Sequence, residues 1–279
     1  MLFLFSGINP PVMRTFCLTL CFCVYSFLSC FAQKLIALPP ELQTIQPLQV
    51  DFKMKGHIYP YQFGPYKLVD AKKEWTKTEE KKVKSSSYRA LFESDGKKTE
   101  KDRSSFVMQG PSNQSVPVNI AVTKETEFSR MKVDLFDNKK GEKVFGNSNT
   151  LYLASFMIDT TRWDVEVKFT EGGEFTFEND FVGMIEANGK RYLLESVFDF
   201  EDGKKRLSGF PIGTVVRYNN KAVAALQFQG HYFSNLKKHS MVWLANELDE
   251  QTKFGLAIAL TALMSKAHQG LMEQPSTDR

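Results

Sequence analysis

The segment from Phe254 to Met264 has the composition of a helix and is apolar at almost every position. It reads Phe-Gly-Leu-Ala-Ile-Ala-Leu-Thr-Ala-Leu-Met, so such a helix would be apolar on every face. A helix of this kind must be enclosed by protein or by lipid. The segment covers about 16 Å, well short of the roughly 30 Å hydrocarbon layer of a membrane. The sequence therefore predicts a helix enclosed by the protein itself.

Most of the chain before this segment has the pattern of β-strands. Trp163, Val165 and Val167 alternate with charged residues, which is the period of a strand with one buried face and one wet face. The stretches 151–158 and 222–228 are apolar at most positions on both faces. We expect these two stretches to be central strands that are covered on both sides.

Turn signals separate the stretches at short intervals. Asn188-Gly189 and Asn219-Asn220 tolerate the positive φ angles that tight hairpins require. Asp95-Gly96 and Asp202-Gly203 indicate further turns. Because strands do not alternate with helices, the sequence predicts about a dozen strands in a mostly antiparallel meander.

These signals together predict a mainly β fold, an antiparallel β-barrel of about 12 strands with a buried carboxy-terminal hydrophobic helix. A barrel of that size has a lumen too wide for its own side chains to fill, whereas a helix about 10 Å across fills it. A curved sheet, or a β-sandwich with the helix packed on one face, is the alternative. The expected helix core consists of Phe254, Leu256, Ile258, Leu260, Leu263 and Met264.

The same patterns set the expected domain boundaries. Residues 33–50 contain Pro39, Pro40 and Pro47 and are expected to form an extended lead-in. Residues 51–268 are expected to form a single barrel domain, with the terminal helix at about 247–267 and Asn246 as its cap. Residues 269–279 are expected to form a flexible tail.

The amino terminus has the pattern of an export signal. Arg14 precedes a mostly apolar run from Phe16 to Phe31, and cleavage is expected after Ala32, which would remove residues 1–32. The residues before Met13 fit no part of such a signal, so Met13 is an alternative start. The sequence thus predicts an exported protein, periplasmic or extracellular.

Two alternatives to cleavage stay open. The apolar run is near the lower limit for a retained membrane anchor, and Cys30 lies in a loose match to a lipoprotein signal, which would anchor the chain through lipid. All four cysteines lie inside the export segment. Cleavage after Ala32 would therefore leave a mature chain with neither a disulfide nor a thiol nucleophile.

Charge and motifs exclude several functions. The net charge is only +4, which together with export argues against binding of nucleic acid. No phosphate-binding loop, G-x-S-x-G elbow or G-x-G-x-x-G turn is present, and we expect no metal and no cofactor. A hydrolase would need a site assembled from distant groups such as His57, His231 and a carboxylate, so an enzyme is the alternative and not the favoured class.

Two kinds of residue are candidates for binding. Aromatic rings crowd residues 57–66, where they either line a ligand groove or, as we favour, seal one end of the barrel. Basic residues at 204–206 lie beside a turn, where they either contact anionic headgroups or keep the loop solvated. The local basic excess between residues 71 and 103 has the same two interpretations. The candidates are Tyr59, Tyr61, Phe63, Tyr66, Lys204, Lys205 and Arg206.

The order of elements resembles the tubby C-terminal-like superfamily, which includes phospholipid scramblases and the plant LURP-one-related proteins. Many strands are followed by Trp243-Leu244, a short acidic start and an apolar carboxy-terminal helix, so the resemblance covers about residues 51–268. It implies a 12-stranded barrel threaded by a central helix, and an association with phosphoinositides or membranes. The expected export and the lack of a counterpart to the scramblases' calcium-binding segment depart from the family.

The sequence therefore favours a non-enzymatic exported β-barrel domain that binds a lipid, a membrane surface or an envelope partner. An anionic lipid or an envelope component is the expected partner class, and no transmembrane span is expected after cleavage. A hydrolase and a purely structural scaffold are the two alternatives.

Overall fold

The computed structural model describes residues 35–52, 61–82, 93–131, 143–171, 181–204, 211–228 and 240–273. The described residues from Ile36 onwards belong to one compact unit, and the fold is that of this unit. Within the described ranges, no helix combines the length and the hydropathy needed to cross a bilayer.

Thirteen strands within the described ranges form one antiparallel sheet, ordered β1-β13-β12-β11-β10-β9-β8-β7-β6-β5-β4-β3-β2. From β2 to β13 each strand pairs with its neighbours along the chain, which is the predicted meander. The strands are β1 (Leu48–Gln49), β2 (Asp51–Phe52), β3 (Tyr61–Phe63), β4 (Tyr66–Lys82), β5 (Glu93–Gln109), β6 (Ser115–Met131), β7 (Lys143–Ile158), β8 (Thr161–Glu171), β9 (Phe181–Ala187), β10 (Lys190–Val197), β11 (Gly213–Tyr218), β12 (Lys221–Gln227) and β13 (Met241–Leu244).

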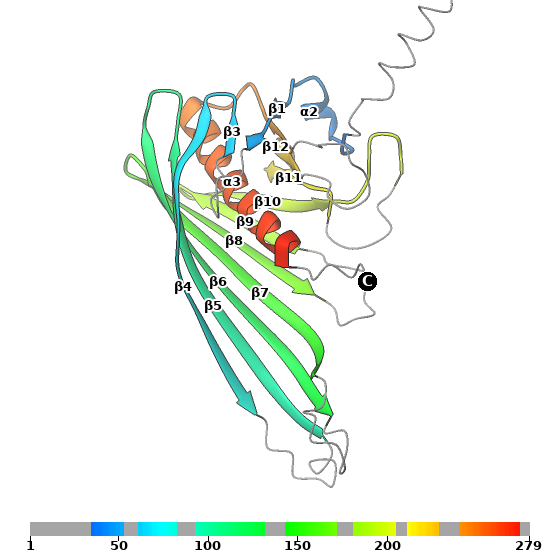
Figure 1. The fold of residues 1–279 in the computed structure, drawn as a ribbon. Helices are drawn as coiled ribbons and strands as arrows, with labels where there is room; N and C mark the ends of the chain where they lie inside the picture. Colours follow the sequence, from blue (N-terminus) through cyan, green and yellow to red (C-terminus); the bar gives the residue numbers. More distant parts are fainter. Residues whose placement is uncertain are drawn as a thin grey trace, which may run out of the picture. The chain divides into compact units, whose positions relative to one another are not determined.

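The two edges of this sheet meet at Val50. β1 pairs with β13 and β2 pairs with β3, yet only Val50 separates β1 from β2. The N–H of Val50 donates to the carbonyl oxygen of Ser240 at 2.9 Å. Taken as two halves of one strand, β1 and β2 turn the sheet into a nearly closed barrel of twelve strands (Figure 1). The predicted fold class is therefore confirmed.

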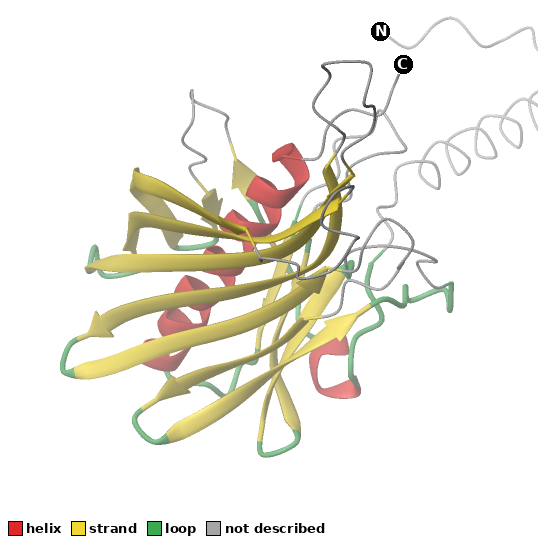
Figure 2. Cartoon of the chain, turned by 90° about the horizontal axis from the view of Figure 1, so that it is seen from below, coloured by secondary structure: helices red, strands yellow, loops and turns green. Residues whose placement is uncertain are grey.

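Helix α3 (Glu250–Glu273) lies inside this barrel. Every residue from Phe254 to Met264 is buried, a run of about three turns that leaves no face of the helix in water. Figure 2 shows strands on both sides of the helix. The predicted core residues are each no more than 3% exposed: Phe254, Leu256, Ile258, Leu260, Leu263 and Met264.

The start of α3 differs from the prediction. The helix begins at Glu250 and ends at Glu273, later at both ends than the predicted 247–267. Asp249 caps it in place of Asn246, since the N–H of Thr252 donates to Asp249 Oδ1 at 2.8 Å. The chain first makes a turn in which the N–H of Leu248 donates to the carbonyl oxygen of Ala245 at 3.3 Å. Because of this turn between β13 and α3, the cap lies three residues later in the chain than predicted.

The lead-in to the barrel, residues 36–50, packs against its wall. It contains the one-turn helix α2 (Pro40–Gln43), whose Leu42 is 0% exposed and which contacts β12. The N–H of Ile36 donates to Gln227 Oε1 at 3.1 Å, and Ile36 also bridges to Phe200. Because α3 and this lead-in cover opposite sides, residues 222–228 are buried throughout, as predicted for a strand covered on both sides.

The prediction that residues 151–158 form a strand covered on both sides is wrong. On β7, Tyr152 and Phe156 are buried against the interior, but Leu153 and Met157 are 40% and 49% exposed. No described segment lies over the outer side of this strand. Its outward apolar side chains therefore form part of the protein surface.

The strands β4 to β7 are the longest of the wall, and their distal halves continue past the end of α3 (Figure 1). We call these distal halves the sheet extension; on β4 it runs from Trp75 to Lys82. The turn predicted at Asp95-Gly96 is not present, because β5 passes straight through Gly96, which pairs with Phe128. By contrast, the turns at 188–189 and 219–220 have the expected positive φ angles.

A candidate binding surface on the sheet extension

The predicted aromatic candidates lie in the core. Tyr61, Phe63 and Tyr66 are 1%, 1% and 2% exposed, and the Tyr66 ring stacks on Phe254 with 6.0 Å between centroids. Burial, with a smaller effect of Glu250, raises the pKa of Tyr66 to about 12. Tyr66 therefore packs against the start of α3, and none of the three buried rings is exposed to a ligand. Tyr59 lies outside the described residues.

Of the basic candidates, only Lys204 is described. It is exposed in the turn after β10, where its N–H donates to Asp202 Oδ1 at 3.1 Å. Its Nζ lies 3.9 Å from the same carboxylate, so it already has a counter-ion. Lys205 and Arg206 lie outside the described residues.

The groups invoked for a hydrolase also lie outside the described ranges, since His57 and His231 are not among them. In the described part of the chain, no three His, Cys, Asp or Glu side chains group as ligands for a metal ion. The structure thus leaves the enzymatic alternative where the sequence left it.

Strand register divides the sheet extension into two faces. Paired residues of adjacent strands share a face, and successive residues alternate between faces. Phe106 pairs with Val118, which pairs with Phe156, and all three are buried on the side of α3. Counting along β5 from Phe106 places Lys98 on this inner face and Arg103 on the outer face.

Four exposed lysines occupy registered positions on the outer face. Lys77 of β4 pairs directly with Lys101 of β5, and Lys81 pairs directly with Lys97. We call these four residues the lysine patch. Like charges placed directly opposite each other destabilise a sheet, so the arrangement needs counter-ions.

Glu79 provides one counter-ion within the patch. Its carboxylate lies 2.7 Å from Lys77 Nζ. The pKa of Glu79 is lowered, first by the hydrogen bond and charge of Lys77 and to a smaller extent by Lys101 and Lys81. One carboxylate therefore lies in the field of three lysines.

Two further carboxylates lie on β6. Glu125 accepts a contact of 2.7 Å from Lys97 Nζ, and Glu127 pairs in register with Lys97. With Arg103 included, the outer face formed by residues 75–81, 97–103 and 121–127 carries five cations and three anions. Asp95 and Glu93 follow on the same face of β5, towards the far end of the extension. The local basic excess of the sequence is therefore partly neutralised and partly left on one face.

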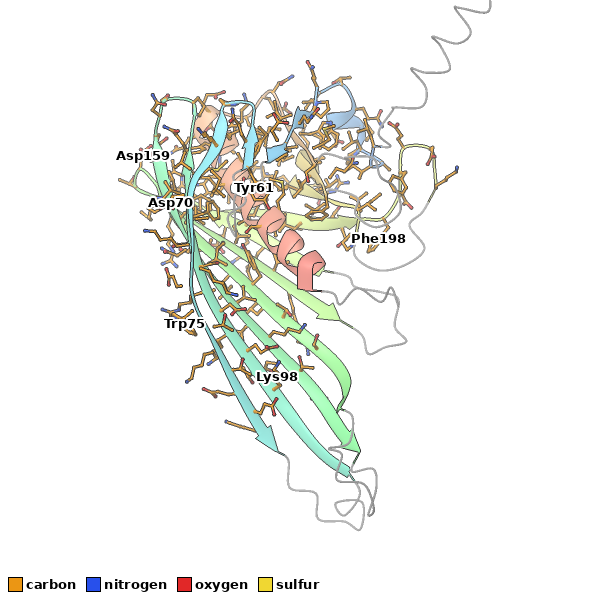
Figure 3. All side chains as sticks on the ribbon, viewed as in Figure 1. Tyr61, Asp70, Trp75, Lys98, Asp159 and Phe198 are labelled. Atoms are coloured by element: carbon orange, nitrogen blue, oxygen red, sulfur yellow. The ribbon has the colours of Figure 1, made fainter. Side chains whose placement is uncertain are left out.

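An exposed tryptophan borders the lysine patch. Trp75 pairs with Arg103, whose guanidinium carbon lies 5.4 Å from the ring centroid, and 41% of Trp75 is exposed. Figure 3 shows Trp75 beside β4, the edge strand of the extension. In the same register row, Ala121 separates Arg103 from the exposed Leu153.

The small Ala121 side chain leaves a hollow between its larger neighbours. It has a volume of about 250 Å³, and both Arg103 and Glu74 line it, so its lining carries both charges. The remaining lining comes from Ser104, Asn119, Ile120, Ala121, Leu153 and Ser155.

On β5 to β7 the inner face of the extension is polar and partly buried. Lys98 Nζ lies 2.8 Å from the Glu100 carboxylate, with both side chains less than one third exposed. Thr150, 1% exposed, is buried nearby, and its hydroxyl has no hydrogen-bond partner. This face therefore offers little free charge, and the outer face is the better binding surface.

The basic excess between residues 71 and 103 is evident in the sequence, but the face of the sheet on which each residue lies is not. Two β-bulges in β4, at Leu68/Asp70 and at Lys73/Trp75, change which residues share a face. The alternation pattern read from the sequence is broken at these points. The proximity of Trp75 to the lysine patch follows only from the register.

Comparison with family models, with curated proteins and with solved structures gives no match to this chain. The fold and the outer face of the extension therefore carry the functional argument by themselves.

Proposed function

We propose that this protein is an exported, non-enzymatic domain that binds an anionic membrane surface through the outer face of its sheet extension. The β-barrel around an enclosed helix is compatible with a non-enzymatic role. The observation that carries the proposal is the register that places the lysine patch and the exposed Trp75 on one face. Kinship with the tubby C-terminal-like superfamily, which implies such an association, is likewise a proposal.

The residue types of this face match what anionic bilayers attract. Basic side chains gain from the negative surface potential of anionic lipids, and that attraction fades within a Debye length. Tryptophan favours the headgroup region, because its ring is apolar and its N–H is polar. The surplus of two cations around the lysine patch is small and local, so we expect weak, reversible binding that depends strongly on salt.

Tryptophan fluorescence offers a direct measurement. The chain has three tryptophans, and Trp163 and Trp243 are 3% and 1% exposed, so only Trp75 meets solvent appreciably. We expect its emission to shift to the blue when vesicles of phosphatidylcholine with about one third phosphatidylglycerol are added at low salt. Raising the salt to about 0.5 M should reverse the shift.

Matched variants separate this face from general charge. Lys97→Gln with Lys101→Gln should lower the bound fraction in a vesicle sedimentation assay at least threefold. Lys190→Gln with Lys204→Gln removes the same charge from exposed lysines elsewhere on the barrel and should have a much smaller effect. Equal losses for the two double variants, or no binding at low salt, would remove the proposal.

A further inference from the structure

Among the described strands, none pairs with most of the outer edge of β4. β3 pairs with β4 only at Tyr66 and Lys67, so within the described ranges no strand pairs with that edge from Leu68 to Lys82. Residues 72–81 are all exposed. Backbone N–H and C=O groups along such an edge are a template for another strand.

Only part of this edge is regular enough to accept a strand. The bulges at Leu68/Asp70 and Lys73/Trp75 interrupt its first half, and bulges are a common device against edge-to-edge pairing. From Trp75 to Lys82 the pairing with β5 has no irregularity. This segment is about 27 Å long at the usual rise per residue.

We propose that two copies of this chain pair through this segment, antiparallel, about a two-fold axis at Thr78. An axis perpendicular to the sheet keeps the outer face of one copy continuous with the outer face of the other. Each residue then lies opposite a residue of the same face, and the axis must pass through a residue position. The proposal is independent of membrane binding.

The charges select Thr78 as the centre. With the axis there, Lys77 lies opposite Glu79 of the second copy, and Glu79 opposite its Lys77. An axis one residue away in either direction would place Lys77 opposite Lys77 or Glu79 opposite Glu79, which destabilises antiparallel pairs.

The pairs further from the axis also fit. Trp75 lies opposite Lys81 of the second copy, which suits a cation–π contact. On the inner face, Thr78 meets its own counterpart and Thr76 lies opposite Glu80. The lysine patches of the two copies then form one continuous surface.

Edge pairing buries less area than a standard interface, so we expect a weak dimer whose population rises with concentration.

Disulfide formation tests the register. In the full chain with Cys17, Cys21, Cys23 and Cys30 changed to serine, a single cysteine is introduced by Thr78→Cys, Thr76→Cys or Glu80→Cys. Only the cysteine on the axis faces its own counterpart across the pair, at a distance that a disulfide spans. We expect mild oxidation to cross-link Thr78→Cys at least tenfold faster than the other two. Similar rates at all three positions, or no cross-link at Thr78→Cys, would overturn the proposal.

A charge swap tests the complementarity. Lys77→Glu and Glu79→Lys should each raise the concentration needed for dimerisation in sedimentation velocity at least fivefold, because each places like charges opposite each other. The double variant Lys77→Glu/Glu79→Lys restores opposite charges and should restore the dimer. Lys101→Glu makes the same charge change one strand from the edge, and it should weaken vesicle binding while leaving the dimer intact. Failure of the double variant to recover dimerisation would contradict the paired register.

Discussion

The hydroxyl of Tyr152 in β7 donates a hydrogen bond of 2.8 Å to the carbonyl oxygen of Ala262 in α3. Tyr152 is 1% exposed and Ala262 is 0% exposed, so the bond joins the wall to the enclosed helix without water. This directional bond favours one depth and one rotation of α3 within the barrel.

Removing this hydroxyl should destabilise the barrel. We expect Tyr152→Phe to lower the free energy of unfolding by about 1–2 kcal/mol, because a buried bond is lost while the ring stays. Urea unfolding followed by circular dichroism measures the change. Tyr218→Phe, in a half-buried ring on β11, serves as the control and should change stability by less than about 0.5 kcal/mol. Equal effects of the two substitutions would contradict the role of this bond.

Alkaline pH should act through the same residue. Burial raises the pKa of Tyr152 far above its usual value, and the pKa of Tyr66 is raised to about 12. The unfolded chain ionises its tyrosines near pH 10, before the folded chain does. Stability is therefore fully present below about pH 10 and falls as the pH rises towards 12.

The free energy of unfolding, measured by urea titration at several pH values between about 8 and 11.5, checks this fall in stability. Burial also raises the pKa of Tyr192, so Tyr152→Phe removes one of three tyrosines with a raised pKa, and the stability of this variant should decline less steeply above about pH 10. A native stability that stays flat up to about pH 11.5 would show that these hydroxyls can ionise in the folded protein.

The close approach of Gly255 to Trp163 predicts a steric effect. A Cβ added at Gly255 would lie 2.5 Å from Cη2 of Trp163, whose ring stacks on Phe156 and on Tyr192. Alanine favours a helix, but this indole is held on two sides and cannot move aside. We expect Gly255→Ala to cost about 1–3 kcal/mol.

A double-mutant cycle in urea unfolding isolates this contact. Trp163→Phe makes room, so Gly255→Ala should cost at least about 1 kcal/mol less in that background than in the native protein. Additive effects would mean that the two positions do not touch.

The unpaired hydroxyl of Thr150 predicts an unusual outcome for a buried polar residue. Thr150 Oγ1 has no partner, whereas the hydroxyl of Thr214, 0% exposed, donates to the carbonyl oxygen of Glu195 at 3.0 Å. Valine has nearly the same shape as threonine. We therefore expect Thr150→Val to be neutral or to stabilise by up to about 1 kcal/mol, and Thr214→Val to destabilise by about 1 kcal/mol. Thermal unfolding of both variants checks this, and a loss at Thr150 as large as that at Thr214 would imply an occupied hydroxyl.

The enclosed helix could be predicted because its composition admits one environment. A helix that is apolar on all sides from Phe254 to Met264 is not stable in water. This local pattern was therefore enough to predict that the helix is enclosed. The hairpins at Asn188-Gly189 and Asn219-Asn220 were equally local, since positive φ angles restrict the residue types that fit.

The binding surface could not be predicted, because it depends on contacts between strands. Nothing near Trp75 in the sequence shows that a bulge precedes it or that Arg103 lies opposite. A strand with apolar residues on both faces can also occur in two settings: it is covered on both sides, or it exposes one apolar face to the surface. Residues 222–228 are covered by the docked lead-in, whereas Leu153 belongs to an outer face that no described segment covers.

The most direct test of the enclosed helix places aspartate on each of its faces in turn. Ala257→Asp, Ile258→Asp, Ala259→Asp and Leu260→Asp are separated by about 100° each and together sample the whole circumference of α3. Because all four positions are 0% exposed, we expect each variant to lose at least about 3 kcal/mol of stability or to fail to fold. One variant that unfolds within about 1 kcal/mol of the native protein would show that this side of the helix faces water, which would contradict enclosure by the barrel.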